Sequence, residues 1–145
     1  MRVFVVAALM CAFAAQAAES RFAALDIYTE TIEPLAAFQF ELTERHGVMQ
    51  VVGIENGDNP GFAHAPYYDR DAVQQGSADR IVVASYSLAD RSVLPRGRER
   101  IATVHVRLRG AIAPEFNLKL IAATDSDGRA IDAAIRYSIS TEDKQ

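Results

Sequence analysis

Apolar and polar side chains alternate along most of this chain with a period of two residues. Between positions 36 and 42, the apolar residues Ala36, Phe38, Phe40 and Leu42 occupy every second place. Successive side chains of a β-strand point to opposite faces of the sheet, so this pattern predicts strands with one buried face. The chain shows seven such segments, at 25–29, 36–42, 48–55, 80–87, 101–109, 116–122 and 131–139.

The alternation also predicts which face of each strand is buried. Phe38 and Phe40 are expected in the core. In the segment 116–122, the core-facing side chains are expected to be Phe116, Leu118, Leu120 and Ala122. In the segment 101–109, the face expected to meet water consists of Thr103, His105, Arg107 and Arg109. This polar row either meets an acidic partner or only keeps an exposed sheet face soluble, and the second interpretation is favoured.

Helical signals are weak throughout the chain. Only Asp69–Gln75 is suited to a helical turn or two, because Asp69 can cap its start and Gly76 can end it. Strands without crossover helices form antiparallel sheets, and two such sheets bury one face each against the other. The sequence therefore predicts an all-β fold, an antiparallel two-sheet β-sandwich. It forms one domain over 18–140 and is followed by a polar tail at 141–145.

Residues 1–17 have the composition of a cleaved signal peptide. Arg2 precedes an apolar run that ends near Ala15, and small residues follow at the expected site of cleavage. The run is shorter than the about 20 apolar residues that a membrane-spanning helix needs. A lipoprotein signal is disfavoured, because Met10 stands before Cys11 where a small residue is required. We expect an extracytoplasmic domain, periplasmic or secreted, with no stable membrane insertion after cleavage.

Charge and cysteine content exclude several classes of function. The chain has 15 basic and 19 acidic residues and a formal net charge of −4, with the signs interspersed. Nucleic acids and anionic membranes are bound by basic patches, so neither is an expected partner. Cys11 is the only cysteine and lies in the predicted signal peptide. The exported domain must therefore be stabilised by its core and not by disulfides.

Four runs of the sequence resemble the cohesin-like domains. They are PLAAFQFEL at 34–42, VVGIENG at 51–57, RIVVASY at 80–86 and RIATVHV at 100–106. The resemblance implies a jelly-roll β-sandwich, related in fold to some carbohydrate-binding modules, that presents a sheet face or loops to another molecule. It implies the architecture and a binding role by analogy, and no contact residue is transferred from it.

The stretch 57–71 is the candidate binding segment, because long irregular loops in compact domains often carry function. Its candidate ligand-binding residues are Phe62, His64, Tyr67, Tyr68 and Asp69. The tyrosine rings are suited to stacking on a sugar or anchoring a protein contact. In the alternative interpretation, Phe62 and one tyrosine plug the open end of the sandwich.

Patterns for catalysis and metal binding are weak. His46, His64 and His105 lack the spacing of a zinc site, and no serine stands in a nucleophile motif. The acidic segment 125–128 departs from a calcium loop, and a plain hairpin turn at Asp127-Gly128 explains it better. We therefore expect no catalytic residue, no metal and no cofactor. The predicted function is a non-catalytic binding or scaffolding module for a protein partner, with a carbohydrate-binding module as the alternative and a small secreted enzyme as the third.

Overall fold

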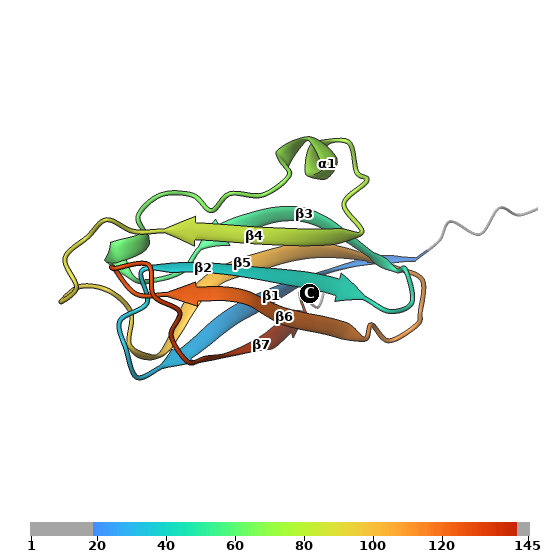
Figure 1. Cartoon of the computed structure of the whole chain (residues 1–145). Coiled ribbons are helices and arrows are strands. Elements are labelled where there is room, and N and C mark those ends of the chain that lie inside the picture. Colours follow the sequence, from blue (N-terminus) through green and yellow to red (C-terminus); the bar gives the residue numbers. More distant parts are fainter. Residues whose placement is uncertain (1–18, 142–145) are drawn as a thin grey trace, which may run out of the picture.

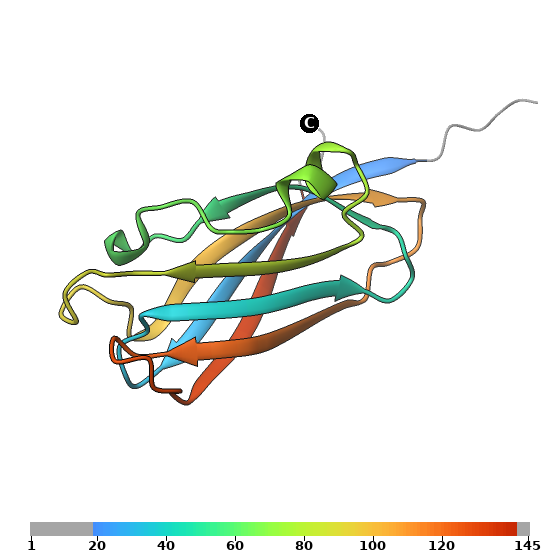
Figure 2. The same ribbon diagram turned by 45° about the horizontal axis from the view of Figure 1, so that its top comes forward.

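The computed structural model describes residues 19–141, which form two antiparallel β-sheets packed face to face (Figure 1 and Figure 2). The strands are β1 (Ser20–Thr31), β2 (Ala37–Glu44), β3 (Met49–Asn56), β4 (Arg80–Tyr86), β5 (Gly97–Arg109), β6 (Phe116–Thr124) and β7 (Ala133–Thr141). Sheet A has the order β3-β5-β1-β7, and sheet B has the order β4-β2-β6. The prediction of an all-β, antiparallel two-sheet sandwich is confirmed.

The loop between β3 and β4 contains the short 3-10 helix η1 (Pro60–Phe62) and the helix α1 (Arg70–Gln74). In Figure 1, α1 lies above β3 and β4, at the edge of the sandwich. No helix in the described part of the chain is long and apolar enough to cross a membrane. The predicted signal peptide, residues 1–17, lies outside the described residues, as does the tail after Thr141.

Each strand from β1 to β6 is followed in the chain by a strand of the other sheet. The connections therefore cross the ends of the sandwich, and within residues 19–141 neither sheet contains a pair of strands joined by a simple hairpin. The predicted turn at Asp127-Gly128 is confirmed, and the backbone amide of Gly128 donates a hydrogen bond of 3.1 Å to the carbonyl oxygen of Asp125. The turn closes only a short bridge between Thr124 and Ala130, after which the chain crosses to β7 in sheet A.

The core lies between the two sheets and follows the predicted alternation. Phe38 is 3% exposed and Phe40 is fully buried, which confirms their predicted place. They face fully buried side chains of sheet A, among them Leu25, Ile27, Val104 and Val106. Burial of this apolar surface is the main stabilising contribution in a domain of this kind.

The alternation breaks in β6, which corrects one expectation. The register with β2 shifts between Gln39 and Phe40, so that Ile121 is an extra residue in β6. Such a bulge reverses the two faces of the strand beyond it. Ala123 is therefore buried, at 8% exposed, and Ala122 is exposed, although Ala122 was expected to face the core.

Candidate functional site

Two exposed tyrosines lie side by side on the outer face of sheet B. In β4, Val83 and Ser85 point into the core, so that Tyr86 points outward and is 54% exposed. The loop brings Tyr67 beside it, because Tyr67 and Ala84 exchange two backbone hydrogen bonds of 2.8 and 3.0 Å. The Tyr67 ring is 60% exposed and nearly parallel to the Tyr86 ring, with an angle of 5° and 6.0 Å between ring centroids.

Small uncharged side chains surround these two rings. The pairing of Tyr67 with Ala84, of Ala84 with Gln39 and of Gln39 with Ala122 forms one row across sheet B. A hollow of about 250 Å³ lies over this row. We call this surface the tyrosine platform, which consists of Ala37, Gln39, Tyr67, Ala84, Tyr86 and Ala122.

A second hollow of about 260 Å³ lies on the other side of Tyr86. Its walls include His64 and Leu88, and Leu88 is 93% exposed. Tyr86 therefore stands between two shallow hollows. The exposed surface around Tyr86 therefore extends from sheet B to the neighbouring residues 61–64 and 87–89.

The loop that carries Tyr67 is held in place by contacts of its own. The side chain of Asn59 accepts a hydrogen bond of 2.8 Å from the backbone of η1 and caps it. Phe62 is 5% exposed, and its ring centroid lies 5.3 Å from that of Phe38 in the core. Asp69 accepts a bond of 2.9 Å from a backbone amide of α1 and caps that helix. Phe62 and Asp69 thus support the loop. The buried position of Phe62 agrees with the alternative interpretation, in which this residue fills the open end of the sandwich.

The other predicted site residues lie partly on the surface. Tyr67 and His64 are exposed on either side of Tyr86. Tyr68 packs partly buried against the core, and the guanidinium carbon of Arg70 lies 4.9 Å from the centroid of its ring. Tyr86 was not predicted as a site residue, because one outward tyrosine in an alternating strand carries no signal by itself.

The tyrosine platform contains no Asp, Glu, Lys, Arg or His side chain. Hydrogen bonding to Tyr86 raises the pKa of Tyr67 above the ordinary tyrosine value. The charges of sheet B lie further along the same face, where Arg80 donates a hydrogen bond of 2.6 Å to Glu41 and Lys119 pairs in register with Glu41. The surface therefore has an uncharged centre and a charged border.

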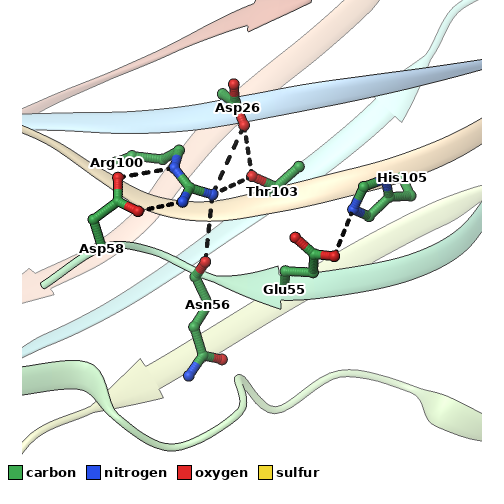
Figure 3. Close-up of polar contacts among 7 residues, drawn as sticks. All are labelled: Asp26, Glu55, Asn56, Asp58, Arg100, Thr103 and His105. Atoms are coloured by element: carbon green, nitrogen blue, oxygen red, sulfur yellow. Dashed lines mark hydrogen bonds and ion pairs between the residues drawn. The ribbon is translucent and has the colours of Figure 1, made fainter. Parts of the chain in front are cut away.

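The outer face of sheet A is different, because it carries a connected polar network (Figure 3). Arg100 of β5 donates to both carboxylate oxygens of Asp58 and, at 3.4 Å, to the carbonyl oxygen of Asn56. It also donates to the hydroxyl of Thr103, which in turn donates to Asp26 of β1. The hydrogen bonds from Arg100 lower the pKa of Asp58. The network ties β1, β5 and the loop after β3 together.

The polar row of β5 is less exposed than the alternation predicted. Thr103 was expected to face water and is 4% exposed, because the network covers its hydroxyl. The Nε2 atom of His105 lies 3.3 Å from a carboxylate oxygen of Glu55, and Arg107 donates to Gln50. Two side chains of this row thus contact side chains of the neighbouring strand β3.

The described residues hold no cluster suited to a metal. Within 19–141, no three His, Cys, Asp or Glu side chains lie close enough together to hold an ion. The carboxylate of Asp125 accepts hydrogen bonds of 2.9 Å from the backbone amides of Arg129 and Asp127. These bonds, mainly that from Arg129, lower the pKa of Asp125. The acidic segment 125–128 is therefore closed as a turn by its own backbone.

Comparison of the chain with protein-family models, with curated proteins and with solved structures found no match. The fold and the surface define the class of the protein as an antiparallel β-sandwich with an exposed aromatic surface on one sheet. The resemblance to cohesin-like domains stays a prediction.

Proposed function

We propose that this protein is an exported, non-catalytic binding module that docks a protein partner on the tyrosine platform. The observation that carries the proposal is the exposed parallel pair of Tyr67 and Tyr86 within an uncharged sheet surface. The centres of protein interfaces are poor in charged residues and rich in tyrosine, which buries much area at a small cost in side-chain entropy.

The surroundings of the pair support the same proposal. Leu88 is 93% exposed at one side of the platform, and Ile121 is 46% exposed on β6 beside Ala122. Large apolar side chains exposed together and bordered by polar residues are typical of interaction sites. Glu41 and Arg80 supply part of such a border.

The platform is also held rigidly before any partner arrives. Ala84 and Gln39 lie in paired strands, and Tyr67 is fixed to Ala84 by two backbone hydrogen bonds. A preformed surface loses less conformational entropy on binding, so more of its contact energy contributes to affinity.

Two features of the sequence agree with this function. The predicted signal peptide at 1–17 supports the proposal that the domain is exported, and the resemblance to cohesin-like domains implies the presentation of a sheet face or of loops. We therefore propose that the domain is exported and that its architecture is a cohesin-like jelly-roll sandwich.

Carbohydrate binding is the second candidate, because hollows of about 250 and 260 Å³ flank Tyr86. Flat aromatic rings at the surface can stack on the apolar face of a sugar. The platform offers the amide of Gln39 as a polar group among mostly apolar walls. A protein partner needs fewer hydrogen bonds from this surface than a sugar does, and we therefore place it first.

The test uses a photoreactive residue at Gln39 in the protein produced in its source organism, followed by mass spectrometry of the cross-linked product. The same residue at Val52, which is 40% exposed on β3 at the edge of sheet A, is the control. The affinity of the purified partner is then measured for the wild type and for Tyr67→Ala/Tyr86→Ala. Phe22→Ala is the matched variant, because Phe22 is an aromatic residue 51% exposed on the other sheet.

We expect one partner to be cross-linked at position 39 and not at position 52. Loss of the two tyrosines is expected to weaken binding about 30-fold or more, since a single interface hot spot of about 2 kcal/mol already corresponds to about 30-fold. Phe22→Ala should leave the affinity unchanged. If no protein is captured at position 39, and the wild type but not the double variant is retarded in polysaccharide gels, the carbohydrate function replaces the proposed one.

A further inference from the structure

Two of the four edge strands of the sandwich are covered or distorted by the loop between β3 and β4. At the edge of sheet A, the register of β3 with β5 shifts at Val52, and the amide of Val51 donates to the carbonyl of Ala78 at 2.8 Å. At the edge of sheet B, Tyr67 pairs with Ala84 of β4. Neither edge therefore offers a regular ladder of free backbone groups to another strand.

The third edge, β6, is interrupted as well. Its register shifts at Ile121, and the carbonyl of Ala123 accepts a hydrogen bond of 3.0 Å from the amide of Ile131. Bulges and covering segments are the devices by which edge strands avoid pairing with other chains.

Within residues 19–141, the fourth edge, β7, has none of these devices. Its nine residues pair with β1 without a register shift, and within the described residues no loop backbone bonds to it. The sequence Ala133–Thr141 has no proline, glycine or lysine, and Arg136 is its only charged residue. A long, regular edge of this composition is suited to pairing with another strand.

The side chains of β7 that share the core face of sheet A are incompletely covered. Tyr137 pairs with Ile27 and Ile139 pairs with Leu25, and these two partners are fully buried. Tyr137 and Ile139 are nevertheless 40% and 45% exposed, since β7 is the edge strand of the four-stranded sheet and sheet B has only three strands. Unpaired backbone and exposed apolar side chains thus occur on the same strand.

We infer that two copies of this protein pair through β7, antiparallel, about a two-fold axis at Tyr137. In this register, Tyr137 lies opposite its own copy and Ile135 lies opposite Ile139 of the second copy. Because the two-fold axis passes through a residue, each core-facing side chain of one copy lies opposite a core-facing side chain of the other copy. On the outer face Arg136 lies opposite Ser138, so that no like charges face each other directly.

The self-complementarity of the strand identifies the occupant as a second copy. Ile135 and Ile139 are placed symmetrically about Tyr137, so one pairing brings both isoleucines of each copy and the two Tyr137 side chains into contact. Aromatic and β-branched pairs across strands are stabilising. An isologous contact of this kind closes after two copies and does not continue into a fibre.

The first test is sedimentation of the purified protein over a range of concentrations. We expect a monomer–dimer equilibrium that Tyr137→Lys and Ile139→Lys each shift toward monomer by about tenfold or more, because the pairing would bury a charge among apolar side chains. Both positions are partly exposed in the monomer, so the variants should fold. Val52→Lys is the matched control, with a lysine at an apolar residue 40% exposed on the distorted edge strand β3, and should leave the equilibrium unchanged.

The second test examines the register, with Cys11 replaced by Ser. Directly opposed residues on neighbouring strands have Cβ atoms about 4.5–5.5 Å apart, so Tyr137→Cys should form an intermolecular disulfide on mild oxidation. Ile139→Cys lies opposite Ile135 and should not cross-link to itself. A monomer at every concentration overturns the inference, and so does a dimer that both lysine variants leave intact. Binding of only a foreign peptide at β7 also overturns it.

Discussion

Replacement of Phe62 by alanine tests how the loop between β3 and β4 is anchored. Phe62 belongs to the three-residue helix η1, and its ring is 5% exposed against Phe38. If this ring plugs the end of the sandwich, its removal leaves a cavity under the loop. The loss should then appear in the global stability of the domain and not only in the loop.

The expected magnitude follows from the position of the ring. Truncation of a buried phenylalanine costs about 3–5 kcal/mol, as lost transfer free energy plus the free energy of the cavity. Phe62 lies at the end of the core on a short turn that can partly collapse, so we expect a loss of about 3 kcal/mol in the free energy of unfolding. With a urea dependence of about 2 kcal/mol per molar, the midpoint of unfolding falls by about 1.5 M.

Urea unfolding followed by far-UV circular dichroism measures this loss, since the chain has no tryptophan to report on the core. Phe22→Ala is the matched control, because Phe22 is 51% exposed on the outer face of sheet A and its removal should cost less than about 1 kcal/mol. A loss below about 1 kcal/mol for Phe62→Ala, or equal losses for the two variants, would refute the role of Phe62 as a plug.

Three further outcomes are expected. Gly57→Ala should destabilise the domain by about 1–3 kcal/mol, because a Cβ there would lie 2.0 Å from a backbone carbonyl oxygen of β5. Gly53→Ala is the control and should cost little, because a Cβ at Gly53 meets nothing within 4 Å. Thermal melts compare the two variants. The folded-state pKa of Asp125 is lowered, so its contribution to stability is present above the unfolded-state pKa and is lost as the pH falls through the folded-state pKa. Asp125→Asn should therefore remove this contribution to the fall in the free energy of unfolding at acid pH, as measured by urea unfolding at several pH values. Tyr86→Phe should lower the pKa of Tyr67, which an absorbance titration of the tyrosines measures against the wild type.

The sequence predicted the strands well because each strand has one face in a dry core. Phe38 and Phe40 are two residues apart, a spacing that puts both rings on the same face of a strand, where the core buries them. The error in β6 has a local cause, since one added residue at Ile121 reverses the faces beyond it and nothing in the composition of 116–122 marks a bulge. Register shifts depend on the pairing with a neighbouring strand, and a single sequence does not contain that pairing.

The candidate site was predictable only in part for a related reason. Tyr67 was found because it lies in a long aromatic loop, but Tyr86 lies 19 positions further on and joins it only through the pairing of Tyr67 with Ala84. Thr103 was predicted to face water because the polar residues of this segment alternate with apolar ones. Its burial comes from Arg100, whose side chain crosses it to reach Asp58 in another segment.

The order of the strands links the stability of the domain to its proposed binding. Because consecutive strands lie in opposite sheets, every ladder joins segments that are distant in the chain, and a topology of this kind is slow to fold. Tyr67 and Tyr86 become neighbours only when the loop pairs with β4 and Phe62 is buried beneath it. A variant such as Phe62→Ala should therefore weaken binding by displacing Tyr67 even where most molecules remain folded. A variant of the distant polar network, such as Thr103→Val, should reduce binding only in proportion to the folded fraction.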